Sequence, residues 1–103
     1  MSDLQRCVLV VDDEFLIAQG LCLQVEDMGL NVCGTAATAE TAVALAQAHR
    51  PSVVLMDVRL RGKGDGVDAA IAIHFTVGSR VIFITGSQDP NTVMRIGITV
   101  TVY

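Results

Sequence analysis

The chain alternates between short apolar runs and longer amphipathic segments. Three apolar runs, at residues 7–11, 53–56 and 81–84, are rich in β-branched residues and have the length of strands. Continuous apolar runs of this length are typical of parallel strands that are buried on both faces of a sheet. The pattern therefore predicts a parallel sheet that is covered by helices on both sides.

Strands and helices are predicted to alternate along the whole chain. The expected strands cover about residues 7–11, 31–36, 53–57, 81–85 and 98–103, and the expected helices about 15–28, 38–49, 67–76 and 91–96. Gly29 suits the end of the first helix, Thr38 the N-cap of the second, and Pro51 the position that stops it. Right-handed crossovers turn this order into an α/β fold, a doubly wound, five-stranded parallel sheet with helices on both faces.

Two of the predicted helices carry a side of mainly apolar residues at helical spacing, the pattern typical of an amphipathic helix. In the first helix these residues are Ile17, Leu21, Val25 and Met28. In the third helix they are Ala70, Ile71, His74 and Phe75.

Composition limits the function. The 103 residues are enough for one domain, and 51% of them are hydrophobic, so the chain can bury a core. The net charge is −4 and Lys63 is the only lysine, which argues against a nucleic-acid surface and against attraction to anionic membranes. No apolar stretch approaches transmembrane length, and the run at 7–11 is too short for a signal sequence. The chain is therefore expected to be cytoplasmic.

Three cysteines, Cys7, Cys22 and Cys33, lie in apolar or strand-like surroundings. Their spacing contains no Cys-x-x-Cys pair, so a zinc site is not expected. We expect buried free thiols that act as small hydrophobic residues. The alternative is a bridge from Cys7 to Cys33 between neighbouring strands, which requires an oxidising compartment.

Polar residues stand where each long apolar run ends. Asp12 and Asp13 follow the first run, Asp57 follows the second and Thr85 follows the third. Ligands bind at the carboxyl ends of the strands in open parallel sheets, so these carboxylates and the hydroxyl should meet in one cleft. The alternatives are that Asp12 and Asp13 only cap a helix, that Asp57 is an ordinary polar strand end, and that Thr85 is an ordinary β-branched strand residue.

The order of these motifs resembles the receiver domain of response regulators, the CheY-like phosphoacceptor half of two-component signalling. The matching segments are Val10-Val11-Asp12-Asp13-Glu14, Leu55-Met56-Asp57-Val58-Arg59-Leu60, Asp65-Gly66 and Ile84-Thr85-Gly86. The resemblance covers essentially the whole chain, so residues 1–103 are interpreted as one receiver domain. It implies the strand order 2-1-3-4-5.

The resemblance also implies a role for each site residue. Asp57 would take a phosphoryl group from a phosphohistidine on a sensor histidine kinase or a phosphotransfer protein. Asp12, Asp13 and Asp57 would hold Mg²⁺ together with the backbone carbonyl of Arg59. Carboxylates that lie close together repel one another, and a hard divalent cation reverses that cost. The chain would be a phosphoacceptor that switches an effector domain or a downstream protein, and not an enzyme.

Near the C-terminus the chain departs from the family pattern. Thr85 is expected to hydrogen-bond the phosphoryl group, and Tyr103 to match the aromatic switch position of the last strand. The strand-five lysine of the family has no counterpart, because the chain stops at Tyr103 and Lys63 lies in another loop. The helix that follows that strand is also missing, so the chain is expected to be a C-terminally truncated receiver. One sheet face would then be uncovered, which predicts a homodimer.

Competing functions remain at this point. A degenerate receiver that acts only as a protein-interaction or dimerisation module is favoured by the missing lysine and opposed by the intact acidic cluster. A haloacid-dehalogenase-type phosphatase needs an aspartate two residues after its nucleophile, where this chain has Arg59. A dinucleotide-binding domain needs glycines after the first strand, and residues 12–15 contain none.

Overall fold

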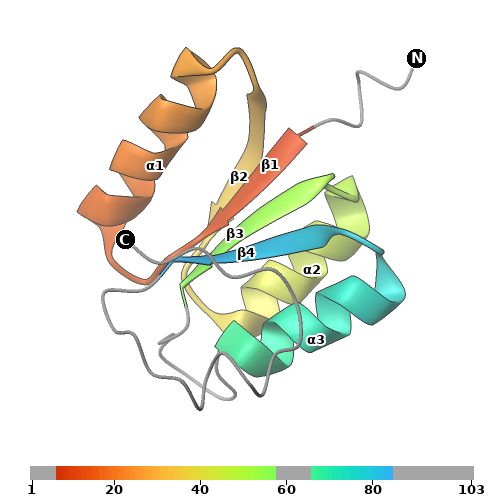
Figure 1. The fold of residues 1–103 in the computed structure, drawn as a ribbon. Helices are drawn as coiled ribbons and strands as arrows, with labels where there is room; N and C mark the ends of the chain where they lie inside the picture. Colours follow the sequence, from red (N-terminus) through yellow and green to blue (C-terminus); the bar gives the residue numbers. More distant parts are fainter. Residues whose placement is uncertain (1–6, 58–65, 85–103) are drawn as a thin grey trace.

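The computed structural model describes residues 7–57 and 66–84, which form a parallel sheet with helices on both faces (Figure 1). Its elements are β1 (Cys7–Val11), α1 (Phe15–Asp27), β2 (Asn31–Ala36), α2 (Ala39–His49), β3 (Val53–Asp57), α3 (Gly66–Thr76) and β4 (Arg80–Ile84). The four described strands are ordered β2-β1-β3-β4, which confirms the predicted order for this part of the sheet. The predicted helix at 91–96 and strand at 98–103 lie outside the described residues.

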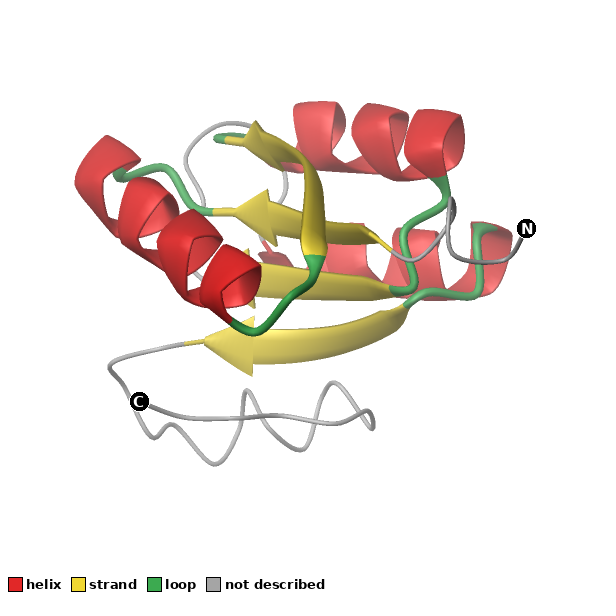
Figure 2. Ribbon diagram, turned by 90° about the horizontal axis from the view of Figure 1, so that it is seen from above, coloured by secondary structure: helices red, strands yellow, loops and turns green. Residues whose placement is uncertain are grey.

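The sheet separates two hydrophobic layers. α1 lies on one face, and α2 and α3 lie on the other (Figure 1). The arrowheads of the strands all point to the same side of the molecule (Figure 2), as parallel pairing requires. Leu9 and Val11 of β1 point into the larger cluster with α2 and α3, whereas Val8 and Val10 point into the smaller cluster with α1. Burial on both faces explains why β1 is a continuous apolar run.

The pairing of β1 with β2 contains an irregularity. Val8 is paired with Val32, but Leu9 is paired with Gly34, so Cys33 is an extra residue in β2. This is the arrangement of a β-bulge, in which two residues of one strand oppose one residue of its neighbour. The register then continues regularly, with Val11 opposite Ala36.

Local sequence signals fix the helix ends as predicted. The Thr38 hydroxyl oxygen accepts a hydrogen bond from the Thr41 backbone N–H at 3.1 Å, so Thr38 is the N-cap of α2. Gly29 follows α1 with a φ of 83°, the left-handed conformation that favours glycine after a helix. α2 ends at His49, its C-cap residue Arg50 has a φ of 48°, and Pro51 follows.

α1 covers its face of the sheet incompletely. It buries Ala18 and Val25, while Ile17 and Met28 are exposed. The apolar side predicted for this helix lines a groove of about 470 Å³ against the neighbouring strands β3 and β4. The residues that line it are Ile17, Leu21, Gln24, Val25, Met28, Leu55, Ile82 and Ile84.

α3 buries a different side from the one predicted. Of the predicted set only Ala70 is buried, while Phe75 is among the most exposed apolar residues described. The buried residues of the helix are Gly66, Val67, Ala69, Ala70 and Ile73. Apolar residues occur on several sides of this helix, so their spacing does not identify the side that meets the sheet. Within residues 7–57 and 66–84, no helix is long and apolar enough to span a bilayer.

Candidate functional site

Three carboxylates meet at the carboxyl-terminal edge of the sheet. Asp12, Asp13 and Asp57 each offer one carboxylate oxygen, and these oxygens all lie within 4.8 Å of one another. Asp12 is buried, and Asp13 and Asp57 are half-buried. The structure thus brings together the three acidic residues that the sequence predicted to converge.

The strand register explains this convergence. Val11 of β1 is paired with Met56 of β3, so the residues that follow, Asp12 and Asp57, are neighbours at the end of the sheet. Asp57 itself is paired with Ile84, the last residue of β4. Because parallel strands end at one edge, the first polar residue after each apolar run comes to the same place.

Hydrogen bonds hold the Asp12 backbone and side chain. Its backbone N–H donates to the Ala36 carbonyl at 2.9 Å, which continues the β1–β2 pairing by one residue. Its Oδ1 accepts from the Glu14 backbone N–H, also at 2.9 Å. These two bonds fix Asp12 at the point where the chain leaves β1 and turns toward α1.

Neither Asp12 nor Asp13 is the N-cap residue of α1. The N-cap residue of α1 is Glu14, and its own side chain makes no capping hydrogen bond. The Asp12 carboxylate holds the Glu14 N–H, and this leaves its second oxygen available to the cluster. The turn therefore orients an acidic side chain toward the sheet edge.

The cluster has the chemistry of a site for a hard cation. Two unit charges about 4 Å apart repel by about 1 kcal/mol in water and by more in a less polar environment. A divalent cation removes this cost, and Mg²⁺ prefers carboxylate oxygens while retaining several waters. Three carboxylate oxygens within 4.8 Å of one another fit that donor set.

The remaining predicted site residues lie outside the described residues. These are Arg59, expected to offer its backbone carbonyl, and Thr85 and Tyr103, expected to respond to the phosphoryl group. Lys63, the only lysine, is also outside them.

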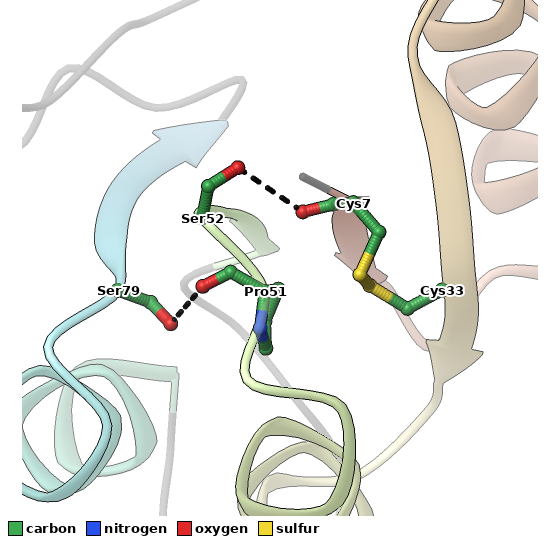
Figure 3. The surroundings of a disulfide bond; sticks show 5 residues. All are labelled: Cys7, Cys33, Pro51, Ser52 and Ser79. Atoms are coloured by element: carbon green, nitrogen blue, oxygen red, sulfur yellow. Dashed lines mark hydrogen bonds between the residues drawn. A yellow bond between two sulfur atoms is a disulfide. The ribbon is translucent and has the colours of Figure 1, made fainter. Parts of the chain in front are cut away.

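The cysteines differ from the expectation of buried free thiols. Cys7 and Cys33 form a disulfide bond, with their Cα atoms 5.3 Å apart (Figure 3). Both residues are only partly buried. The expectation of free thiols was wrong for this pair, because the bulge in β2 turns Cys33 toward Cys7. The alternative, a bridge between the neighbouring first two strands, is the arrangement found. Cys22 is the free cysteine among the described residues, and burial, with a smaller effect of the Glu26 carboxylate, raises the pKa of its thiol.

Comparison of the sequence with models of known protein families agrees with the fold and with the acidic cluster. Residues 8–99 match the model of the response regulator receiver domain. The chain therefore belongs to the response regulator receiver family, and it has the CheY-like fold of that family.

Named relatives support this assignment. The chain is 39% identical over 89 residues to the phyllosphere-induced regulator PhyR of Methylorubrum extorquens, covering 85% of this chain and 33% of that protein. It is 33% identical over 90 residues to the transcriptional regulatory protein PdtaR of Mycobacterium tuberculosis, covering 87% of this chain and 43% of that protein. The chain thus spans less than half the length of these curated relatives.

A solved structure gives the same result for the fold. The signal receiver domain of a modulated diguanylate cyclase from Desulfovibrio desulfuricans G20 superposes with a TM-score of 0.85 at 35% identity. The match covers 92% of this chain and 79% of the compared chain.

Proposed function

We propose that this chain is the phosphoacceptor domain of a two-component response regulator, and that Asp57 receives the phosphoryl group. The observation that carries the proposal is the meeting of Asp12, Asp13 and Asp57 at the carboxyl edge of the sheet. Membership of the receiver family supports it. The donor is a phosphohistidine on a sensor histidine kinase or on a phosphotransfer protein.

The transfer needs an ionised nucleophile and compensation for the charge of the phosphoryl oxygens. A carboxylate oxygen of Asp57 attacks phosphorus and forms an O–P bond while the P–N bond to the donor imidazole breaks. The imidazole leaves with the electron pair and takes up a proton, and Asp57 becomes an acyl phosphate. Water later cleaves that bond and restores the carboxylate, so the domain carries a signal and is not a turnover enzyme.

Asp12 and Asp13 would hold Mg²⁺ together with Asp57. When bound, this ion offsets the negative charge of the carboxylates and of the incoming phosphoryl group. Asp12 is suited to this role because the Ala36 carbonyl and the Glu14 N–H fix it before any ligand arrives. We further propose that the Arg59 carbonyl joins the ligand set and that Thr85 and Tyr103 respond to phosphorylation.

The signal passes to an effector domain or to a separate downstream protein. Histidine kinases present their phosphohistidine in the cytoplasm, so we place the domain there. The net charge of −4 argues against direct contact with nucleic acid or an anionic membrane.

Phosphorylation by a small donor tests the proposal. With acetyl phosphate and Mg²⁺, the intact protein should gain the mass of one phosphoryl group, and borohydride reduction followed by peptide mapping should place it on Asp57. Removal of the metal with EDTA should reduce incorporation to background. Incorporation that resists EDTA, or that maps to another residue, would contradict the proposal.

Magnesium binding can be measured separately. Titration with Mg²⁺ should shift the amide signals at the ends of β1 and β3, with weak affinity because Mg²⁺ gives up its waters reluctantly. Asp13→Asn should weaken binding at least about tenfold, the effect of about 1.4 kcal/mol. The matched control is Asp27→Asn, which makes the same charge change at the last residue of α1. Equal binding by both variants would show that the site is wrong.

We also propose that two copies associate through α1. The helix carries exposed Phe15, Leu16 and Leu23, and another side of it lines the apolar groove. Burying apolar surface yields about 25 cal/mol per Å². Sedimentation at micromolar concentration should give a dimer, and Leu16→Glu should give a monomer. Phe75→Glu on α3 is the control, because Phe75 is 80% exposed and Leu16 is 81% exposed. A monomeric wild-type protein would refute the dimer.

A further inference from the structure

The disulfide between Cys7 and Cys33 lies near the amino-terminal end of β1, whereas the acidic cluster lies at the carboxyl-terminal end of the strands. Cys7 is the first residue of β1, whereas Asp12 follows the last residue of that strand. Phosphoryl transfer as proposed above makes no use of this bond. We propose that Cys7 and Cys33 are a reversible thiol–disulfide modification site, whose oxidised form ties the outer strand β2 to β1 and whose reduced form loosens β2.

The two cysteines are positioned to form and to lose the bond. Their Cα atoms are 5.3 Å apart, within the usual range for a disulfide, so little backbone movement is needed in either direction. Cys33 is the extra residue of the bulge, and it lies outside the regular pairing of β1 with β2. Both residues are partly buried rather than enclosed in the core, so a small thiol can reach them.

The hydrogen bonds around Cys7 indicate which strand responds. The Cys7 carbonyl accepts from the Ser52 backbone N–H at 3.1 Å. It also accepts from the Ser52 hydroxyl at 3.4 Å (Figure 3). The Arg80 N–H donates to the Ser52 carbonyl at 3.0 Å, so β1, β3 and β4 are linked at this edge without the disulfide.

β2 is joined to the sheet through one strand. Among the described strands it pairs with β1 alone and lies at the end of the sheet. Of the four described strands it also has the fewest buried residues. Reduction should therefore loosen β2 while β1 stays in place.

The bond closes a covalent loop that contains two of the three clustered carboxylates. Cys7 and Cys33 are separated by 26 positions, and this interval holds Asp12, Asp13 and all of α1. If the domain acts in the cytoplasm, which rests on the function proposed above, a permanent disulfide is not expected. Disulfides in that compartment are usually transient, and they often sense redox state.

Oxidised glutathione, a small-molecule disulfide, would serve as oxidant. One cysteine thiolate attacks a glutathione sulfur, which forms a mixed disulfide and releases one glutathione thiolate. The second cysteine thiolate then attacks the protein sulfur of that mixed disulfide and releases the other. The cysteines lose two electrons to oxidised glutathione, and the two released thiolates take up the two protons. Burial raises the pKa of the Cys22 thiol, which lowers the fraction of its reactive thiolate.

Equilibration of the folded protein in glutathione buffers tests the proposal. The full chain carrying Cys22→Ser is incubated at a series of ratios of reduced to oxidised glutathione, quenched by alkylation and weighed by mass spectrometry. We expect the disulfide to disappear in excess reduced glutathione and to re-form in excess oxidised glutathione. A bond that persists in excess reduced glutathione would be a permanent structural link, and thiols that never pair would rule out the bond. Either result overturns the proposal.

The effect on β2 is measured on the same two forms. Reduction should raise amide hydrogen exchange in residues 31–34 about tenfold or more and lower the melting temperature by about 10 °C or more. Cys33→Ser should match the reduced form in every buffer. Unchanged exchange and melting would overturn the role of the bond in holding β2. None of these readouts involves phosphate, so failure here is distinguishable from failure of the phosphoacceptor function.

Discussion

Asp57→Asn should abolish phosphoryl incorporation from acetyl phosphate. The amide of asparagine has no anionic oxygen to attack phosphorus, so no acyl phosphate can form. Asp27→Asn, which makes the same charge change, should retain full incorporation, because Asp27 is the last residue of the 13-residue helix α1 and lies about 20 Å along it from the acidic edge. Intact-mass spectrometry after a fixed reaction time measures both variants.

The same substitution should also stabilise the domain in the absence of Mg²⁺. It removes one of three like charges whose oxygens lie within 4.8 Å, and relief of this repulsion is worth on the order of 1 kcal/mol. The gain in melting temperature should shrink when Mg²⁺ is added, because the wild-type cluster is then neutralised. Residual phosphorylation of Asp57→Asn would show that another residue accepts the phosphoryl group. Unchanged stability would show that the three charges are screened from one another.

Phe83→Ala should cost about 3–5 kcal/mol of unfolding free energy. Phe83 lies in β4, has no exposed surface, and packs in the larger cluster between the sheet and helices α2 and α3. Its truncation leaves a cavity that rigid neighbouring strands cannot fill. For a domain of this size, the loss corresponds to a fall in melting temperature of about 15 °C or more.

Phe75→Ala is the matched control for that experiment. Phe75 is 80% exposed on α3, so the same truncation removes almost no buried surface and should change stability by less than about 0.5 kcal/mol. Thermal unfolding followed by circular dichroism compares the two variants. Equal losses would mean that the packing of β4 against α2 and α3 is not what stabilises the sheet.

Most of the described fold could be predicted because β1 is buried on both faces and β3 is buried on one face and partly buried on the other. Their apolar runs end where the strands end, so the predicted bounds match Cys7–Val11 and Val53–Asp57. The acidic site followed from the same signal, since the polar residue after each run lies at the strand end. β4 begins one residue earlier than predicted because Arg80 pairs with Val53 while its side chain stays exposed.

Other features depend on tertiary contacts that a sequence pattern does not record. The buried side of α3 could not be read from spacing, because Ile71 and Phe75 are as apolar as the residues that face the sheet. The disulfide depends on the bulge at Cys33, which breaks the alternation that a regular strand would have. The buried side of α3 and the disulfide were both predicted wrongly, because in each case the sequence allows two arrangements and packing selects one.

The bulge also has a consequence for insertions and deletions in this chain. Val32 and Gly34 are opposite consecutive residues of β1, so a chain without Cys33 would bring them together in an unbroken ladder. Their side chains already belong to opposite faces, since Val32 packs in the cluster with α1 and a Cβ at Gly34 would point at Leu45 of α2. Losing Cys33 would therefore regularise β2, whereas losing a residue from the paired part of the strand would turn its remaining side chains to the wrong face. Deletion of Cys33 would thus remove the disulfide and still preserve the pairing of β2 with β1. The bond can therefore be lost without loss of the fold.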